Sequence, residues 1–511
     1  MSCMDYEQTY KLVVDIMRNC QNSELLIMLL FLFLPLLFLT NIRWTNGQNS
    51  VDRSKADWKV AVYEHKPVGT GKDPPVQLML QNLRAYAAAA TEAAALGARL
   101  IVFPEYGLLS TASYSSRDQL LKYLQQIPTD PDPCESSSAL ESEVIKEISC
   151  LAKSHGLTII VNLGTIHWCN HTGKSNPQCP PDGRFQYNSN LVFNERGAII
   201  AVYHKYNLFG ERFFDTPPLD FVTFTTPWGV IGVGTCFDLL QSDPLLRLIQ
   251  ERRVDAVVLP SLWFNRIPFL ALYEIAEGWA VRTGITLLVA NVHSPITAHV
   301  GSGIFGPDGV IDYTYVTDVS SGGQLIVAPL PMPVKGQSRA VPSALILNSH
   351  ENDQHAFQTM TNGDLFWYTA LGEGINQNTI FCRDNLCCQV NYTYKQEPQH
   401  PGYFALGLFS GMHTENYTLY NEMCAVVRCL DERHCGDGIA SAVGGLSDLS
   451  LTGNFSSGSY AYPTVLVDNA LLASAGQWRF DRSRQVLHGS ESLKSILVFG
   501  LYGRNFAKDR S

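Results

Sequence analysis

The sequence lacks the extended runs of Lys and Arg that mark a nucleic-acid-binding surface. Its formal net charge is −10 at pH 7, so the overall field of the protein repels phosphate. The composition, with 46% hydrophobic and 16% charged residues, is that of an ordinary globular protein. We therefore expect no nucleic-acid partner, and a length of 511 residues predicts two or three domains.

The chain also has no apolar run long enough for an ordinary membrane span. The segment Leu25 to Leu39 is uncharged and contains one Pro, but a spanning helix needs about 20 apolar residues. It is typical of a signal-peptide core, and cleavage near Gly47 puts Thr45 and Gly47 at the small-residue positions. We predict that residues 1–47 are a signal peptide and that the mature protein is secreted, with no stable membrane association. The alternative is an uncleaved signal anchor that tethers the protein to a membrane.

The 13 cysteines include no C-x-x-C pair, so they lack the usual zinc-binding pattern, and export favours disulfides instead. Removing Cys3 and Cys20 with the leader leaves an odd number, so at least one thiol stays unpaired. Cys236 is isolated in the sequence and is the best candidate for that free thiol. The other cysteines are expected to pair within clusters: Cys134 with Cys150, Cys169 with Cys179, and Cys382, Cys387, Cys388, Cys424, Cys429 and Cys435 among themselves.

Four N-x-S/T sequons agree with a secretory route, because they are acceptors for N-glycosylation. They begin at Asn170, Asn391, Asn416 and Asn454. Each sequon alone is a weak signal. Together with the leader and the cysteine clusters, they predict an extracellular glycoprotein.

Predicted strands and helices alternate along the first half of the chain. Residues 59–65 are typical of a strand, and residues 81–97 form an Ala-rich helix that ends at Gly97. A helix followed by a buried strand recurs over residues 141–164, 243–261 and 268–293. This pattern predicts an α/β domain at 57–333, with buried strands flanked by helices.

Helical patterns fade after about Leu330, and alternating segments take over together with most of the clustered cysteines. A Pro-rich stretch at residues 328–343 separates the two regions, as linkers often do. We predict a second domain at 334–511 that is smaller, mainly β and stapled by disulfides.

Three chemically active residues follow predicted strands of the first domain: Glu105 after "IVFP", Lys205 after "AVYH" and Cys236 after "IGVGT". Strand ends on one edge of a layered sheet converge on a shared crevice. A carboxylate base at Glu105 would activate a thiol that is mostly protonated near neutrality. Lys205 and the backbone N–H of Phe237 would stabilise the oxyanion that forms on an amide carbonyl. These are the parts of a thiol-dependent amidase.

Each of these residues also has an ordinary structural explanation when it is taken alone. A buried Cys packs as a small hydrophobe, a Glu after a strand can be a turn acid, and a Lys is most often a solvated surface cation. Spacing by itself leaves both interpretations open.

The motifs "IVFPEYG", "AVYHKYNLF" and "GVGTCFD" resemble the Glu, Lys and Cys motifs of the nitrilase superfamily, in that order. The segments "HKYNLFGERFF", "GTCFDLLQSDP", "LCCQVNYTY" and "FALGLFSGMHT" are similar to the vanin and biotinidase branch. The resemblance covers nearly all of residues 57–504. It implies a four-layer α-β-β-α catalytic domain and a triad of Glu105, Lys205 and Cys236. It also implies hydrolysis of a secondary amide through a thioester, with no metal or organic cofactor.

Within that branch the resemblance leaves the small-molecule amide substrate open. Vanins hydrolyse pantetheine to pantothenate and cysteamine, which is the expected reaction, whereas biotinidase acts on biocytin. A rival interpretation is a catalytically silent binding protein on the same scaffold. Many vanins carry an apolar C-terminal signal for a glycolipid anchor, and this chain ends "LYGRNFAKDRS".

Several further residues are expected near the site. Glu211 is a candidate second carboxylate by resemblance, and Trp263 and His293 follow predicted strands and are candidates to line the pocket, although packing explains them equally well. The "GSGIFG" segment matches a dinucleotide-binding pattern, but a turn and a strand are predicted after it. We therefore expect a hairpin there. The sequence contains no feature that indicates the oligomeric state.

Overall fold

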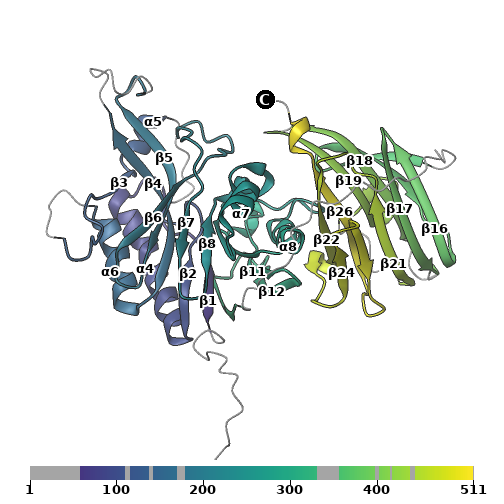
Figure 1. The fold of residues 1–511 in the computed structure, drawn as a ribbon, viewed down its shortest axis with the longest axis horizontal. Helices are drawn as coiled ribbons and strands as arrows, with labels where there is room; N and C mark the ends of the chain where they lie inside the picture. The colour runs from purple at the N-terminus through teal and green to yellow at the C-terminus, as the bar shows by residue number, and fades with distance from the viewer. Residues whose placement is uncertain are drawn as a thin grey trace, which may run out of the picture. The chain divides into compact units, whose positions relative to one another are not determined.

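Two sheets in the first part of the chain provide the framework for the site (Figure 1). The computed structural model describes residues 58–109, 116–136, 142–169, 179–330, 356–396, 402–414, 417–437 and 444–509. The predicted signal peptide and most of the Pro-rich boundary, including the expected domain border at 333–334, lie outside these residues.

The first sheet has the order β13-β1-β2-β4-β5-β6, and β3 pairs with β4. Its strands are β1 (Lys59–Glu64), β2 (Ala98–Val102), β3 (Gln125–Gln126), β4 (Thr158–Trp168), β5 (Arg184–Phe193), β6 (Ile199–His204) and β13 (Gln324–Pro329). The second sheet has the order β12-β11-β10-β9-β8-β7. Its strands are β7 (Thr223–Thr225), β8 (Val230–Val233), β9 (Ala256–Pro260), β10 (Thr286–Ala290), β11 (Ser302–Gly306) and β12 (Gly309–Thr314). In the middle of each sheet, neighbouring strands run parallel, as in β1 with β2 and β9 with β10.

Helices cover the outer faces of the two sheets, so the expected α-β-β-α layering is confirmed (Figure 1). The described α-helices of this part are α4 (Pro75–Ala95), α5 (Arg117–Leu121), α6 (Glu143–His155), α7 (Arg247–Arg252) and α8 (Leu272–Thr283). Apolar side chains of α4 and α6 pack on the first sheet, and those of α7 and α8 pack on the second. A separate core, which includes Val60, Val102, Ile160, Val233 and Leu288, fills the space between the sheets.

The ends of the helices follow from local chemistry. The Ser142 hydroxyl accepts a hydrogen bond from the Ile145 N–H at 3.1 Å and so caps α6. Gly156 ends that helix in the left-handed conformation, with φ of 60°, which glycine adopts readily because it has no Cβ. Helix α4 begins earlier than the sequence pattern suggests, because Pro75 occupies the first helical position, where a missing N–H costs nothing.

The "GSGIFG" segment forms strand β11 and turns directly into β12, with Gly306 paired to Gly309. The expected hairpin is therefore confirmed. Strand β12 follows this segment instead of the helix that a dinucleotide site requires.

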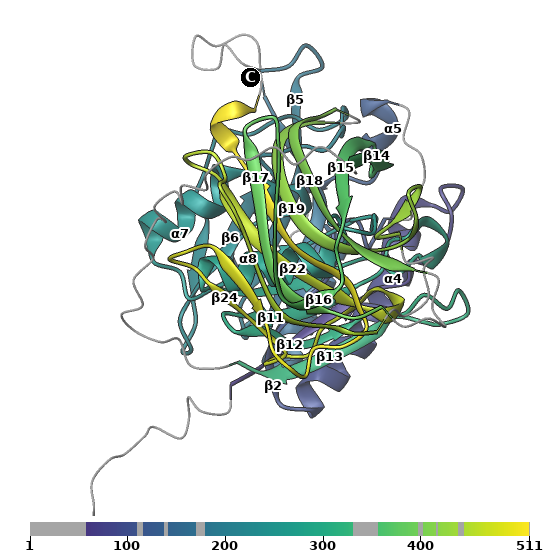
Figure 2. The same cartoon turned by 90° about the vertical axis from the view of Figure 1, so that its right-hand side faces the viewer.

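The C-terminal part contains two further sheets, which confirms a mainly β region (Figure 2). One has the order β14-β15-β18-β19-β26-β22-β23, with β20 on β19, and the other has the order β16-β17-β21-β25-β24. The strands are β14 (Ala356–Thr361), β15 (Asp364–Ala370), β16 (Gly374–Arg383), β17 (Leu386–Tyr394), β18 (Tyr403–Thr414), β19 (Thr418–Asp431), β20 (His434–Cys435), β21 (Leu446–Gly453), β22 (Tyr460–Val467), β23 (Leu471–Leu472), β24 (Trp478–Asp481), β25 (Val486–Gly489) and β26 (Ile496–Arg504).

Disulfides staple this region as the clusters predict. Cys388 on β17 is bonded to Cys424 on β19 and so joins the two sheets, whereas the other two C-terminal bonds close short loops. The five bonds are Cys134–Cys150, Cys169–Cys179, Cys382–Cys387, Cys388–Cys424 and Cys429–Cys435. Cys236 is the free cysteine of the described residues, as expected.

Helix α8 connects the two parts of the fold, because one of its faces packs against β22. The Thr464 hydroxyl of β22 donates a hydrogen bond to the buried carboxylate of Glu274. One turn further along α8, Glu277 is equally buried and accepts a hydrogen bond from the Val310 N–H at 2.9 Å. Burial raises the pKa of Glu274 to about 7 and that of Glu277 to about 8.

These carboxyl groups make stability depend on pH. Each folded-state pKa lies above the ordinary Glu value of 4.5, so the unfolded chain releases these protons first as the pH rises. Stability contributed by the protonated groups is therefore lost as the pH rises from about 4.5 through the folded-state values of about 7 and about 8.

We predict that Glu277→Gln raises the midpoint of thermal unfolding by about 2 °C or more at a pH of about 8.5, and changes it little at about pH 5. The amide keeps an oxygen for the Val310 N–H but carries no charge. Glu147→Gln, at an exposed position of α6, is the matched control. A gain of equal size at both pH values would contradict the assignment of a buried, titrating carboxyl.

Candidate active site

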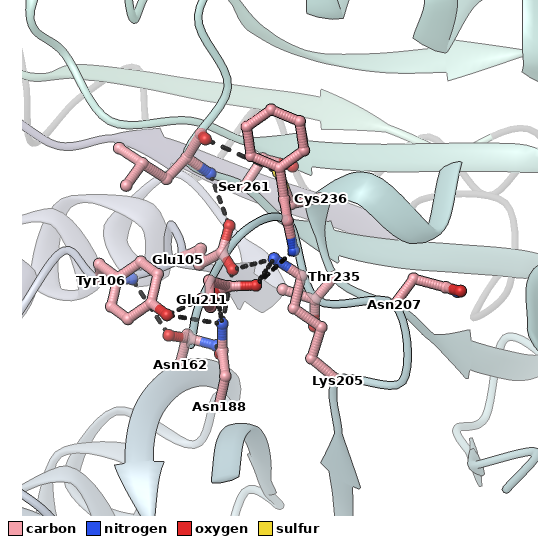
Figure 3. Close-up of polar contacts among 12 residues, drawn as sticks. Glu105, Tyr106, Asn162, Asn188, Lys205, Asn207, Glu211, Thr235, Cys236 and Ser261 are labelled. Carbon is pink, nitrogen blue, oxygen red and sulfur yellow. Dashed lines mark hydrogen bonds and ion pairs between the residues drawn. The ribbon is translucent and has the colours of Figure 1, made fainter. Parts of the chain in front are cut away.

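The fold brings Glu105, Lys205 and Cys236 into one buried cluster (Figure 3). Glu105 follows β2, Lys205 follows β6 directly and Cys236 follows β8. The Lys205 ammonium lies 2.8 Å from Glu105 Oε1.

One peptide segment links the acid to the thiol. The backbone N–H of Leu262 donates to Glu105 Oε2 at 3.0 Å, and its carbonyl accepts from the Cys236 thiol at 3.7 Å. Strand β9 ends at Pro260, so the second sheet places this segment beside the Cys236 thiol. The three side chains that the sequence pattern singles out are therefore neighbours.

Cys236 has a backbone conformation that non-glycine residues rarely adopt, with φ of 46°. It begins the short 3-10 helix Cys236–Leu240, just after β8. The Asp238 carboxylate fixes this turn by accepting from the Thr235 N–H at 2.9 Å and from the Tyr203 hydroxyl at 2.7 Å. Strained residues that surrounding contacts hold in place are typical of functional sites.

Glu211 is a second carboxylate on the same ammonium group, with its Oε2 atom 2.9 Å from Lys205 Nζ. Its other oxygen accepts from the Tyr106 hydroxyl at 2.5 Å and from the Asn188 amide at 2.8 Å. The backbone N–H of Phe209 donates to Oε2 at 2.9 Å. One buried ammonium is thus shared by two carboxylates, and neutral donors satisfy the remaining oxygens.

Buried asparagines complete the network. The Asn188 amide donates to Glu105 Oε1 at 2.7 Å as well as to Glu211, so it lies between the two acids. Asn162 donates to the side-chain oxygens of Asn188 and Asn190, and Asn190 donates to the Gly234 carbonyl. Sequence reasoning missed these residues. The available signal was the polar "NSN" run directly before the apolar "LVF" end of a predicted strand, because buried polar groups require partners.

Burial and charge set the protonation of the cluster. Burial, with a contribution from Glu211, raises the pKa of Glu105 despite the adjacent Lys205. The pKa of Glu211 is lowered overall. Burial alone would raise it, but the charge of Lys205 and the hydrogen-bond donors outweigh that effect. Burial lowers the pKa of Lys205, but the two carboxylates raise it well above its usual range. The cluster therefore holds an ammonium ion, an ionised Glu211 and a Glu105 whose affinity for protons is increased.

The Cys236 thiol opens onto a largely apolar pocket. Phe237 and Trp263 line it, and the Trp263 indole N–H donates to the Leu270 carbonyl at 3.0 Å. The lining residues are Phe209, Cys236, Phe237, Leu240, Leu262, Trp263, Phe264, Arg266, Leu270 and Tyr417.

His293 does not belong to that lining. It is buried elsewhere, with Nδ1 2.7 Å from Glu64 Oε1 and Nε2 2.9 Å from the Ser321 hydroxyl. Within the described ranges, no group of three or more His, Cys, Asp and Glu side chains is placed to hold a metal ion.

A buried thiol, an acid and an ammonium that meet at strand ends of an α-β-β-α sandwich are the arrangement expected of a carbon–nitrogen hydrolase. The family model for carbon-nitrogen hydrolases matches residues 59–311, and the vanin C-terminal domain model matches residues 355–509. The chain belongs to the vanin and biotinidase family of these enzymes.

Relatives in that family match most of the chain. A pantetheinase from Mus musculus is 34% identical over 465 residues, covering 88% of this chain and 89% of its own length. A pantetheinase from Homo sapiens is 32% identical over 469 residues, with the same coverage. A biotinidase from Homo sapiens is 30% identical over 533 residues, covering 94% of this chain and 95% of its own.

We predict that Cys236 is a neutral thiol in the resting protein, because burial, followed by the charge on Glu105, raises its pKa well above the usual range. The difference in ultraviolet absorbance between the wild-type protein and Cys236→Ser isolates the thiolate from the tyrosines. It should show no thiolate at neutral pH, and thiolate should appear only at a higher pH than in a free cysteine. A thiolate that appears near neutrality would instead indicate a preformed ion pair with Lys205.

Proposed function

We propose that this protein hydrolyses the amide bond of pantetheine to pantothenate and cysteamine, with Cys236 as nucleophile. The observation that carries the proposal is an unpaired thiol beside a buried Glu105–Lys205 ion pair. The family relationship supports the substrate, since relatives named pantetheinase match 88% of the chain.

Acylation begins when the Cys236 sulfur attacks the amide carbonyl and the thiol proton passes to Glu105. Base assistance is needed because burial disfavours the free thiolate. Lys205 and the backbone N–H of Phe237 stabilise the oxyanion. Glu105 then returns the proton to the departing nitrogen, and cysteamine leaves.

Deacylation uses the same groups in a second addition. Glu105 takes a proton from a water molecule, which attacks the thioester, and Lys205 stabilises the second oxyanion. Collapse of this intermediate releases pantothenate and restores the Cys236 thiol. Glu211 does not exchange protons in this scheme. Its lowered pKa keeps it ionised, so it balances the charge of Lys205 throughout the cycle.

A biotinidase-like reaction on biocytin is the second candidate, and the similarity to biotinidase over 94% of the chain favours it. Both reactions use the same thiol and differ in the group that the pocket must hold. A catalytically silent scaffold is a weaker alternative, because it has no need to retain all three buried residues.

The five disulfides are those of a protein that matures in an oxidising compartment. We propose secretion after cleavage of the predicted signal peptide, with the signal anchor as the alternative. Among the described residues, no helix is long and apolar enough to cross a membrane. Of the proposed glycosylation sites, Asn391 is exposed on β17 and Asn454 is partly buried, while Asn170 and Asn416 lie outside the described residues.

The proposed roles of Lys205 and Glu105 predict different losses of catalytic activity when each residue is replaced. Lys205→Ala removes the oxyanion partner and should lower kcat by about 10² to 10³. Glu105→Gln removes the base and should abolish both formation and hydrolysis of the thioester, which single-turnover kinetics separate. The control is Glu147→Gln, which makes the same change on the surface. Near-normal turnover by Lys205→Ala would rule out its catalytic role.

Folding must be measured in parallel for the Lys205 variant. Removing the ammonium leaves two buried carboxylates without a counter-ion, which costs about 3–5 kcal/mol. Activity is therefore compared at temperatures well below the unfolding midpoint of the variant. A loss of activity that follows the fraction unfolded would assign Lys205 a structural role only.

The covalent intermediate tests the whole proposal. With pantetheine as substrate, acid-quenched enzyme should carry a pantothenoyl group on the peptide that contains Cys236, detected by mass spectrometry. Cysteamine should be released before pantothenate. Biocytin assayed in parallel distinguishes the second candidate, which would give a biotinyl adduct. Normal turnover by Cys236→Ala would exclude both reactions as written.

A further inference from the structure

One wall of the pocket beside Cys236 comes from the C-terminal part of the chain. Tyr417 lines the pocket, whereas the other lining residues lie between Phe209 and Leu270. It directly precedes β19, at the end of the β18–β19 hairpin where Thr414 pairs with Thr418.

Tyr417 packs into an aromatic cluster next to the nucleophile. Its ring centroid lies 5.2 Å from that of Phe209 and 5.1 Å from that of Phe237, and those two rings are 5.2 Å apart. Phe237 directly follows Cys236 in the chain. The three rings therefore form a continuous apolar surface that begins one residue from the reacting sulfur.

A buried polar pair in the C-terminal part holds this ring. The His413 ring lies 4.9 Å from that of Tyr417, and its Nδ1 atom is 2.9 Å from Asp364 Oδ2. His413 is only 1% exposed and comes from β18, whereas Asp364 begins β15 in the same sheet. The C-terminal sheet thus carries Tyr417 and contacts one side of its ring, while Phe209 and Phe237 contact it from the first part of the chain.

We propose that Tyr417 is a specificity-determining residue, contributed by the C-terminal domain, which contacts the acyl group bound beside Cys236 and limits its size. This inference rests on the proposed amidase function and assigns the acyl side of the substrate to the pocket. Cysteamine is small, so the acyl chain of pantetheine is the part with enough surface to contact three rings. His413 and Asp364 are positioning residues that act through Tyr417.

The test compares two amides of cysteamine that share the leaving group and differ in acyl length, pantetheine and N-acetylcysteamine. Tyr417→Ala should lower kcat/KM for pantetheine about tenfold, mainly through KM, because ring contacts with the acyl chain are lost. The value for N-acetylcysteamine should change by less than about twofold. Tyr417→Phe keeps the ring and should retain most of the selectivity.

The matched control is Tyr420→Ala, which makes the same substitution three residues further along, at a ring outside the pocket lining. All Tyr417 variants named here preserve the Asn416 sequon, whose middle position accepts any residue except Pro. Equal losses on both substrates, or no change on either, would overturn the proposal. The proposal would also be overturned if the control variant Tyr420→Ala showed the same shift in selectivity.

A second measurement separates failure of this inference from failure of the proposed function. Cys236 is alkylated with iodoacetamide and, separately, with the bulkier N-cyclohexylmaleimide. Tyr417→Ala should speed the reaction with the maleimide at least about fivefold relative to iodoacetamide, because the wall has been removed. If the wild-type protein does not hydrolyse pantetheine but this ratio rises in Tyr417→Ala, the proposed function is wrong, and the proposal that Tyr417 limits the size of the pocket is supported. An unchanged ratio would overturn the proposal that Tyr417 limits the size of the pocket.

Discussion

The buried ion pair between Lys205 and Glu105 is the interaction on which the rest of the site depends. An ammonium ion this deeply buried is tolerable only if nearby negative charge compensates for lost hydration. Glu105 and Glu211 supply that charge. Two carboxylates on one cation leave an excess negative charge, which the donors from Asn188, Tyr106 and Phe209 offset. The geometry of the proposed base is therefore fixed before any substrate binds.

This network also explains the state of the nucleophile. Cys236 is buried beside an excess of negative charge, which raises the pKa of its thiol, and the thiol donates to the Leu262 carbonyl. The backbone N–H of the same residue, Leu262, donates to Glu105, so one residue contacts both the acid and the thiol. In the proposed mechanism, a protonated resting thiol makes proton transfer to Glu105 part of the first chemical step.

The C-terminal part of the chain takes part in the site as well as in the fold. Its sheet packs on α8, buries Glu274 against Thr464 and carries Tyr417 to the pocket. The disulfide between Cys388 and Cys424 joins the two sheets behind this surface. In the described residues, the pocket is thus lined by side chains from both parts of the chain.

The sequence by itself determined the layered α/β fold, the mainly β region after it, the local cysteine pairs and the three strand ends that carry Glu105, Lys205 and Cys236. These features depend on short-range patterns, such as the Gly stop after α6 and the isolation of Cys236 from other cysteines. Only the tertiary structure decided that Asn188 bridges two acids, that His293 lies outside the pocket and that Tyr417 lies inside it. Each of these contacts joins residues from strands or loops far apart in the chain, and no local periodicity encodes which distant side chains meet when sheets stack.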